Sequence, residues 1–394
     1  MSGIPDTAAF GELRLREFPG LADTIYLNSA SYGPVPQRAH AAIRAFEERR
    51  AAGMLQPADF SGVLDRMRAV AGRLVGGAPD GVALVPNTSV GLNLAAVIVR
   101  QRAQRTGAGA PRTVILPDGE FPANVYGWMA LEKSGFRMER VPTDADGCPG
   151  EDALVERLLQ GDVAALAISA VQFSTGWAAD LIRLGRACRE AGALFVVDAI
   201  QAAGVYPLDV EAAHVDVLAT GGHKWLCGPF GTGFAWIRPE LCREYEPDLP
   251  GWLAFESSMD FESLLSYRWD LFPDARRFEV GSLPIQGFVG LAESVEMLLD
   301  IGVDTVRSYL SSLQAPIQAW AGRTAGAAAV VTDPRRLAGI LSVRVPDATA
   351  LHAHLTEAGI STVPREGAVR FAPHVFNTPD EMERVVHQLD QWQR

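Results

Sequence analysis

A lysine and an aspartate each stand at the end of a short apolar run, where together they could carry out carbonyl chemistry. Lys224 follows His223 and a pair of glycines, and Asp198 closes the run Leu194–Val197. A buried lysine amine condenses with an aldehyde, and a carboxylate holds a proton on a ring nitrogen. Taken singly, the two residues are better explained as a surface lysine after a strand and an aspartate that caps a loop. Together, with Gln201 just past the acid, they favour the chemical interpretation.

This pair predicts a site for pyridoxal phosphate (PLP), a cofactor with a phosphate, a protonated ring, a phenolic oxygen and an aldehyde. Lys224 is the candidate to bind the aldehyde covalently and then to act as the base that moves a Cα proton. That role requires a lowered pKa, which burial beside a cationic ring would supply. Asp198 is expected to keep the ring nitrogen protonated, His223 to reach the phosphate, and Gln201 to bond the phenolic oxygen or the region near the aldehyde.

Candidates for the remaining cofactor groups follow other predicted strands. Thr88 and Ser89 open a predicted helix after the first strand, and a helix start that carries hydroxyls suits a phosphate. The same residue types also serve as an ordinary helix cap. Phe121 is a candidate to stack on the ring, although an aromatic side chain there could equally belong to the core. Gln172 is a second candidate for the phenolic oxygen.

The bulk composition is that of a globular protein and argues against several kinds of partner. A chain of 394 residues can bury a large core, and we expect two lobes. The net charge of −12 argues against nucleic-acid and anionic-membrane partners. The four cysteines form no CxxC pair and no metal-ligand spacing, so we expect free thiols, no bound metal and a cytoplasmic location. Residues 1–7 lack the features of a signal peptide, and no apolar run reaches membrane-spanning length.

The middle of the chain alternates apolar runs with helix-like segments. Strands that are apolar on both faces and separated by helices predict an α/β fold with a mostly parallel sheet covered on both sides. Ligands of such sheets bind at the carboxyl ends of the strands, where the candidate residues stand. The expected strands lie at residues 82–85, 113–116, 164–168, 194–201, 216–226 and 233–237, and the expected helices near 89–104, 123–133 and 181–191.

The C-terminal third predicts a smaller α+β lobe. We expect an irregular stretch at residues 247–273, one long helix at about 284–321, strands at 340–345 and 369–371, and helices at 348–358 and 380–393. The predicted division is an N-terminal segment (1–40) packed on the lobes, a large cofactor-binding domain (41–282) and a small C-terminal domain (283–394).

With these motifs the chain resembles the class V aminotransferase group of fold-type I PLP enzymes, which includes cysteine desulfurases, kynureninases and isopenicillin N epimerases. Further matches are the segments Tyr26–Ser31, Arg277–Ser282 and Val369–Thr378. The resemblance implies a large domain with a seven-stranded type of sheet and a smaller C-terminal domain. It also implies a homodimer with shared active sites, in which Ser282 reaches the phosphate of the neighbouring subunit.

The resemblance assigns substrate contacts as well. Arg370 is expected to grip the α-carboxylate of an amino acid, a bidentate task that suits guanidinium, and Asn28 and Ala30 are expected to contact the substrate. A solvated charge at the end of a strand is the alternative for Arg370, and Arg365 is the competing candidate for the carboxylate.

Two departures from the group's pattern narrow the expected reaction. The stretch Ile360–Arg370 contains no cysteine, so a persulfide-forming cysteine desulfurase is not expected. Phe121 stands where those enzymes stack a histidine, which points to the kynureninase and epimerase side of the group.

The predicted function is that of a PLP-dependent enzyme acting at Cα or Cβ of an α-amino acid, as a lyase or an epimerase. An aminotransferase is the alternative, because the first steps are shared and the outcome depends on the shape of the pocket. A non-catalytic PLP-binding protein is a further alternative. A nucleotide-binding α/β protein is disfavoured, because no GxxxxGK[ST] motif and no convincing GxGxxG follow the first strand.

Overall fold

The computed structural model describes residues 7–392. The expectation of no signal peptide rests mainly on residues 1–6, and the predicted helix end at Gln393 falls on a further residue outside the described part of the chain. None of the helices within the described range is long and apolar enough to cross a membrane.

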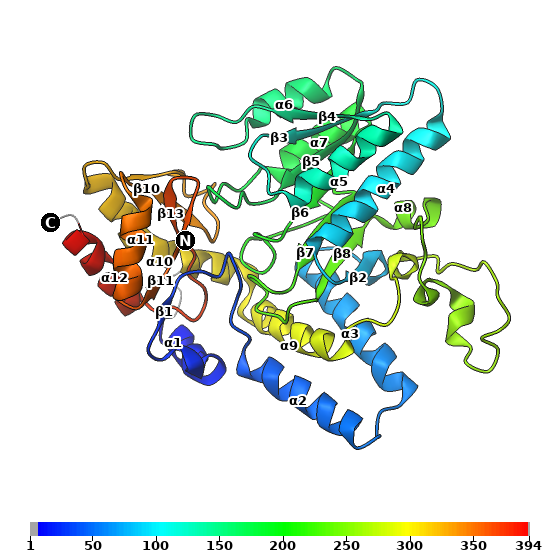
Figure 1. Cartoon of the computed structure of the whole chain (residues 1–394), viewed down its shortest axis with the longest axis horizontal. Coiled ribbons are helices and arrows are strands. Elements are labelled where there is room, and N and C mark those ends of the chain that lie inside the picture. Colours follow the sequence, from blue (N-terminus) through cyan, green and yellow to red (C-terminus); the bar gives the residue numbers. More distant parts are fainter. Residues whose placement is uncertain (1–6, 393–394) are drawn as a thin grey trace.

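A seven-stranded sheet forms the centre of the larger lobe (Figure 1). Its order is β2-β8-β7-β6-β5-β3-β4, and only β8 runs antiparallel to its neighbours. The predicted mostly parallel α/β sheet is therefore confirmed. The strands are β2 (Val82–Val85), β3 (Thr113–Pro117), β4 (Arg137–Val141), β5 (Val163–Ser169), β6 (Leu194–Asp198), β7 (Val217–Gly221) and β8 (Gly233–Ile237).

Helices cover both faces of this sheet, because successive residues of each strand point to opposite sides. In β5, Leu166 and Ile168 join the core under α3 (Pro57–Val75), α7 (Leu181–Ala191) and α9 (Ile285–Ile301). Ala165 and Ala167 join a second core, under α4 (Thr88–Thr106), α5 (Ala123–Leu131) and α8 (Pro239–Glu244). The remaining helices of this lobe are α2 (Gln37–Ala51) and α6 (Glu151–Leu158).

The edge strand β4 was not predicted. Its sequence, Arg137–Val141, contains three charged residues among five, and only Val141 is buried. Exposed arginines stand at both Arg137 and Arg140, so the apolar run that identifies the central strands, and also β2 at the other edge, is missing here.

A second, antiparallel sheet belongs to the C-terminal lobe, with the order β12-β13-β10-β9. It pairs β9 (Ala328–Ala329), β10 (Leu341–Arg344), β12 (Val363–Arg365) and β13 (Ala368–Phe371), and carries α11 (Ala348–Glu357) and α12 (Pro379–Trp392). The predicted strands and helices of this region are confirmed within a few residues.

The predicted long helix at 284–321 is wrong in one respect, since it is two helices. Gly302, with φ +87°, separates α9 from α10 (Val303–Arg323). This backbone conformation favours glycine and ends a helix. In Figure 1, α9 lies under the large sheet while α10 lies with the C-terminal sheet. The domain division at residues 40 and 282 stays a prediction.

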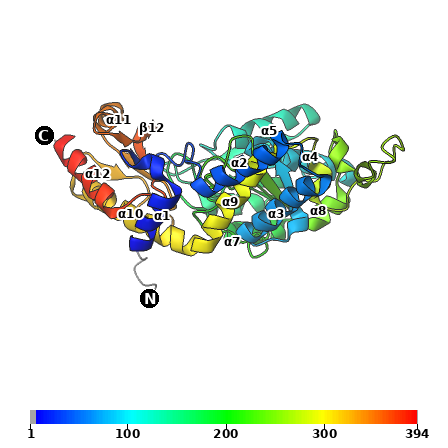
Figure 2. The same cartoon turned by 90° about the horizontal axis from the view of Figure 1, so that it is seen from below.

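The N-terminal residues pack against the C-terminal lobe, as Figure 2 shows for α1 (Thr7–Glu17) beside α10 and α12. The rings of Phe10 and Tyr309 stack with centroids 3.7 Å apart, and Arg14 forms an ion pair with Glu381 at 2.5 Å. Farther along, β1 (Ile25–Tyr26) pairs in parallel with β11 (Ile360–Ser361). These contacts carry the chain from the C-terminal lobe to the carboxyl ends of the large sheet.

Candidate active site

The candidate site lies where the carboxyl ends of the parallel strands meet. Asp198 is the last residue of β6, and Lys224 follows β7 by three residues. Thr88, Phe121 and Gln172 follow β2, β3 and β5 in the same way. Because these strands are neighbours or near neighbours in one sheet, residues scattered over more than 130 positions come together.

Lys224 lies against the ring of Phe121. Its Nζ is 5.5 Å from the ring centroid, and the residue is only 9% exposed. Burial lowers the pKa of this amine to about 8, although the charge of Asp198 acts in the opposite direction. Arg370 and Arg365 lower the pKa further. About a tenth of the amine is therefore neutral and nucleophilic at pH 7, far more than for an ordinary lysine.

Asp198 is buried with one carboxylate oxygen engaged and one free. Its Oδ1 accepts a hydrogen bond from the backbone N–H of Ile200 at 2.9 Å. Its Oδ2 has no hydrogen-bond partner among the residues that the structure describes. Burial raises the pKa of this acid to about 6, and Lys224 opposes the rise. A buried oxygen without a partner is rare in folded proteins and indicates that a donor is to be supplied.

Unpartnered polar atoms gather at this site. Within residues 7–392, eight buried side-chain nitrogen or oxygen atoms have no hydrogen-bond partner. Four of the eight belong to predicted site residues: Thr88 Oγ1, Gln172 Nε2, Asp198 Oδ2 and Arg370 Nε. A cluster of unmet donors and acceptors costs free energy in an isolated chain, so it indicates a polar ligand.

Thr88 and His223 approach each other across Gly221. A Cβ atom on this glycine would lie 3.1 Å from His223 Nδ1 and 3.3 Å from Thr88 Oγ1. Asn87 caps α4 by accepting from the backbone N–H of Val90 at 3.1 Å, which leaves the Thr88 hydroxyl free. The exposed Ser89 follows in the same first turn. Together they place hydroxyls at the amino-terminal end of a long helix, where anions bind well.

Gln201 and Gln172 differ in which of their amide atoms are free to bind a ligand. Gln201 donates from Nε2 to the carbonyl of Ala30 at 3.1 Å and accepts at Oε1 from Trp225 Nε1 at 2.7 Å. Both ends of its amide are engaged, so in this structure it ties the N-terminal segment to the lysine loop. Gln172 accepts from the backbone N–H of Phe173, and its Nε2 is free. For a phenolic oxygen, which needs a donor, the geometry favours Gln172 over Gln201.

Arg370 projects from β13 into the same space. Its Nη1 donates to the carbonyl of Phe173 at 3.0 Å and its Nη2 to Ser31 Oγ at 2.9 Å. Burial, with a smaller contribution from the charge of Arg365, lowers the pKa of Arg370 to about 10. Ser31 in turn donates to Asn28 Oδ1 at 2.7 Å. Asn28 therefore orients the residue that holds Arg370, and Ala30 contributes the carbonyl that holds Gln201.

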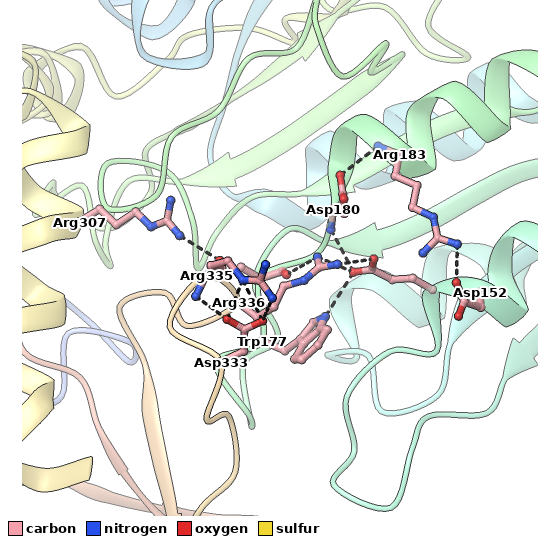
Figure 3. Close-up of polar contacts among 10 residues, drawn as sticks. Asp152, Trp177, Asp180, Arg183, Arg307, Asp333, Arg335 and Arg336 are labelled. Carbon is pink, nitrogen blue, oxygen red and sulfur yellow. Dashed lines mark hydrogen bonds and ion pairs between the residues drawn. The ribbon is translucent and has the colours of Figure 1, made fainter. Parts of the chain in front are cut away.

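The loop after Gln172 is fixed by an ion pair that links the two lobes (Figure 3). Arg336 donates to Glu151 from both terminal nitrogens, at 2.9 and 3.0 Å, and lies over the ring of Trp177. Glu151 also accepts from the indole of Trp177 and from the backbone N–H of Asp180. The segment that presents Gln172 and Phe173 to the site is therefore held from both lobes.

Ser282 does not join the other candidates within one chain. It lines an apolar groove of about 800 Å³, together with Phe46, Phe60, Trp252 and Phe272. Its expected contact with the phosphate of a neighbouring subunit stays a prediction.

Three residues of the site were missed in the sequence: Glu120, Asn124 and Ser169. Glu120 is buried, accepts hydrogen bonds from the other two and lies one position before Phe121. A glutamate between a strand and a helix is typical of a surface turn, so its burial was not predictable from its type. No group of three or more histidine, cysteine or acidic residues suited to a metal occurs in the described range.

A family model described as "Aminotransferase class-V" matches residues 25–363. A probable cysteine desulfurase of Aeropyrum pernix is 28% identical over 404 residues, which cover 95% of this chain and 96% of that protein. An isopenicillin N epimerase of Streptomyces clavuligerus is 27% identical over 388 residues, with 93% and 94% covered. An uncharacterized aminotransferase of Bacillus subtilis is 28% identical over 320 residues, or 80% of each chain.

Solved structures share the fold. The apo structure of a cysteine desulfurase from Thermococcus onnurineus has a TM-score of 0.85 at 22% identity and covers 100% of this chain and 98% of its own. A cystine C-S lyase, solved in complex with its product cysteine persulfide, has a TM-score of 0.80 at 21% identity, with 95% and 99% covered. At these identities the likeness establishes the architecture.

Proposed function

Since the chain belongs to the class V aminotransferase family, whose members are PLP-dependent, we propose that it is an enzyme acting at Cα or Cβ of an α-amino acid. The observation that carries the proposal is the set of four unpartnered buried atoms around Lys224. Each has a counterpart among the polar groups of PLP and an amino acid, so the residues present fit the cofactor.

The proposed assignments pair each atom with one group. Asp198 Oδ2 is the acceptor for the ring N–H, and Gln172 Nε2 is a donor for the phenolic oxygen. Thr88, with Ser89 and His223, is the donor set for the phosphate. Phe121, half exposed beside the Lys224 amine, offers its face to the ring.

In the proposed reaction this chain's residues bind the substrate and move its proton. When bound, PLP supplies an electron sink that stabilises negative charge at Cα. Lys224, whose pKa burial lowers to about 8, is suited to accept and return the Cα proton. Arg370 orients the substrate by its carboxylate, and Asp198 maintains the positive charge on the ring.

Within the family we propose a lyase or an epimerase rather than a persulfide-forming desulfurase. All four cysteines of the chain are buried, and burial raises the pKa of Cys148, Cys227 and Cys242 to about 12. A cysteine that takes up sulfur must be accessible and reach the thiolate form. An aminotransferase is the second candidate, because removal of the Cα proton is common to all these reactions. Free, unpaired thiols also agree with a cytoplasmic location.

A homodimer with shared sites forms part of the proposal. The groove that contains Ser282 is lined mainly by apolar residues with several charged ones, and the neighbouring segment exposes large side chains at Phe261, Leu265, Tyr267 and Trp269. Exposed apolar surface of this kind is typical of a subunit interface.

Incubation of the PLP-loaded protein with a panel of α-amino acids tests the reaction. Release of ammonia and a keto acid, with no second amino acid formed, would support elimination. Inversion at Cα, followed as deuterium uptake from D₂O, would support epimerisation. Reaction that strictly requires an added keto acid would establish the aminotransferase instead. Absence of deuterium exchange at Cα with every amino acid would overturn the proposal.

Exchange of Arg370 for lysine should raise KM by a factor of about 10 or more, equivalent to about 1.4 kcal/mol. A lysine cannot reproduce the two parallel hydrogen bonds between a guanidinium and a carboxylate. The matched control is Arg365→Lys. Arg365 lies on the same face of the hairpin, since Val363 pairs with Arg370 and Arg365 with Ala368, but it is exposed. We expect this variant to leave KM nearly unchanged. If Arg365→Lys raised KM and Arg370→Lys did not, Arg365 would be the residue that binds the carboxylate.

A further inference from the structure

Glu120 is a buried acid whose carboxylate is surrounded by hydrogen-bond donors. Its Oε1 accepts from the backbone N–H of Ser169 at 2.7 Å, and its Oε2 accepts from Ser169 Oγ at 2.5 Å and from Asn124 Nδ2 at 3.1 Å. Trp128 donates to Asn124 Oδ1 at 3.3 Å and so fixes which way that amide points. No lysine or arginine of the described chain forms an ion pair with Glu120.

Ser169 connects this acid to the candidate site. It is the last residue of β5 and lies directly opposite Asp198, the last residue of β6, in the parallel register. The next residue, Ala170, donates its N–H to the carbonyl of Asp198 at 2.8 Å. A second buried carboxylate, which follows β3, therefore lies on the far side of β5 from Asp198, and the role proposed above for the site gives it no task.

We propose that Glu120 is a positioning residue, which acts through Ser169 to hold the end of β5 beside Asp198 and places a second negative charge behind that acid. This charge strengthens the hold of the site on the proton of the cofactor ring nitrogen. The inference rests on the proposed function, because it assigns Asp198 to that nitrogen.

The hydrogen-bond donors around Glu120 favour its ionised form, while its burial and the charge of Asp198 oppose ionisation. The Ser169 N–H and the Nδ2 group of Asn124 can only donate, so they stabilise a carboxylate and not a carboxylic acid O–H. Burial, with a smaller contribution from the charge of Asp198, raises the pKa of Glu120 to about 7 against the lowering effect of the hydrogen bonds from Ser169 and Asn124. Lys224 is the cation that acts on Asp198. A negative charge in this setting is compensated when a cation, such as a protonated ring, lies on the far side of Asp198.

Chemical unfolding of the apo protein, from pH 4.5 to 7.5, gives the first test. The folded pKa of Glu120 lies above its ordinary value of 4.5, so its contribution to stability is present below pH 4.5 and is lost as the pH rises through about 7. Over that window the group changes the unfolding equilibrium constant by up to about tenfold per pH unit. Glu120→Gln should remove this dependence and leave that of Asp198. Parallel pH profiles for the two proteins would overturn the inference.

The loaded protein gives the second test, with PLP labelled with ¹⁵N in the ring. The nitrogen chemical shift reports its protonation directly and does not depend on turnover. We expect the nitrogen of Glu120→Gln to lose its proton at a lower pH than that of the unaltered protein. An identical titration would refute the inference, because a purely structural role for Glu120 would not move it.

Ser169→Ala is the companion variant. It removes the hydroxyl that donates to Glu120 Oε2 and leaves the Glu120 carboxylate in place. The pKa of Glu120 should then rise further, so the pH dependence of apo stability should move to higher pH instead of disappearing. An unchanged profile would contradict the proposed coupling even if Glu120→Gln failed to fold. If PLP bound to none of the proteins, the proposed function would fail, while the apo profiles would still decide whether Glu120 titrates as described.

Discussion

Replacement of Lys224 by alanine is expected to lower turnover by a factor on the order of 10³ or more, because both a nucleophile and a proton-transfer base are lost. The buried amine lies 5.5 Å from the Phe121 ring centroid, and no other lysine of the chain is within the site. Added methylamine should restore part of the activity, since a small amine can enter the space left by the side chain. The measurement is the initial rate with the substrate found in the amino-acid panel.

The chain offers an unusually clean control for this experiment, because it contains just two lysines, Lys133 and Lys224. Lys133→Ala should retain full activity, since Lys133 lies in an exposed turn after α5. Borohydride reduction of the loaded protein should label the peptide with Lys224 and leave the Lys133 peptide unlabelled. Label on Lys133, or full activity of Lys224→Ala, would remove the basis of the proposed function.

Asp198→Asn should leave PLP bound but reduce turnover by about 10²-fold, which corresponds to about 3 kcal/mol of lost transition-state stabilisation. The amide keeps the shape of the side chain but cannot hold a positive charge on the ring nitrogen. Because Lys224, Thr88 and Gln172 bind other parts of the cofactor in the proposed arrangement, cofactor content should change little. Cofactor content and turnover are measured on the same preparation.

Asp216→Asn is the matched control for this variant. Asp216 is also a buried acid of the large sheet, but it stands at the opposite end of β7, where it accepts from the Phe195 N–H and pairs with Arg238 at 2.8 Å. Its replacement should lower the unfolding temperature and leave turnover per loaded molecule nearly unchanged. If Asp198→Asn behaved like Asp216→Asn, the role proposed for Asp198 would be wrong.

The parts of the fold that the sequence predicts are those where burial selects apolar residues. The central strands β5, β6 and β7 are continuous apolar runs because helices cover both faces of the sheet. The edge strand β4 exposes its charged residues and carries no such pattern. The break at Gly302 was missed because the apolar periodicity continues from α9 into α10, and a single glycine is a weak signal within it.

For the candidate site, residue type and position at the end of a strand were sufficient to bring Lys224 and Asp198 together, while Arg370, which lies within β13, was found through the family resemblance. Residue type and position do not predict which side chains from distant parts of the sequence form hydrogen bonds with one another. That Gln201 is held by Ala30 and Trp225, while Nε2 of Gln172 has no partner among the described residues, depends on the meeting of distant segments. The same holds for Glu120, whose donors come from α5 and from the end of β5.

The ion pair between Glu151 and Arg336 determines how the molecule can admit a substrate. It joins α6 to the segment before β10, and a swing of the C-terminal lobe would leave the buried Glu151 without its counter-ion. The side chain of Glu151 is 5% exposed and that of Arg336 is 25% exposed, so the pair is partly buried and its separation opposes a large rigid-body opening. Entry should instead require only local motion of the segment 28–33 and of single side chains. We therefore expect the pocket to be largely formed before the substrate binds, and the lobes to move little when it does.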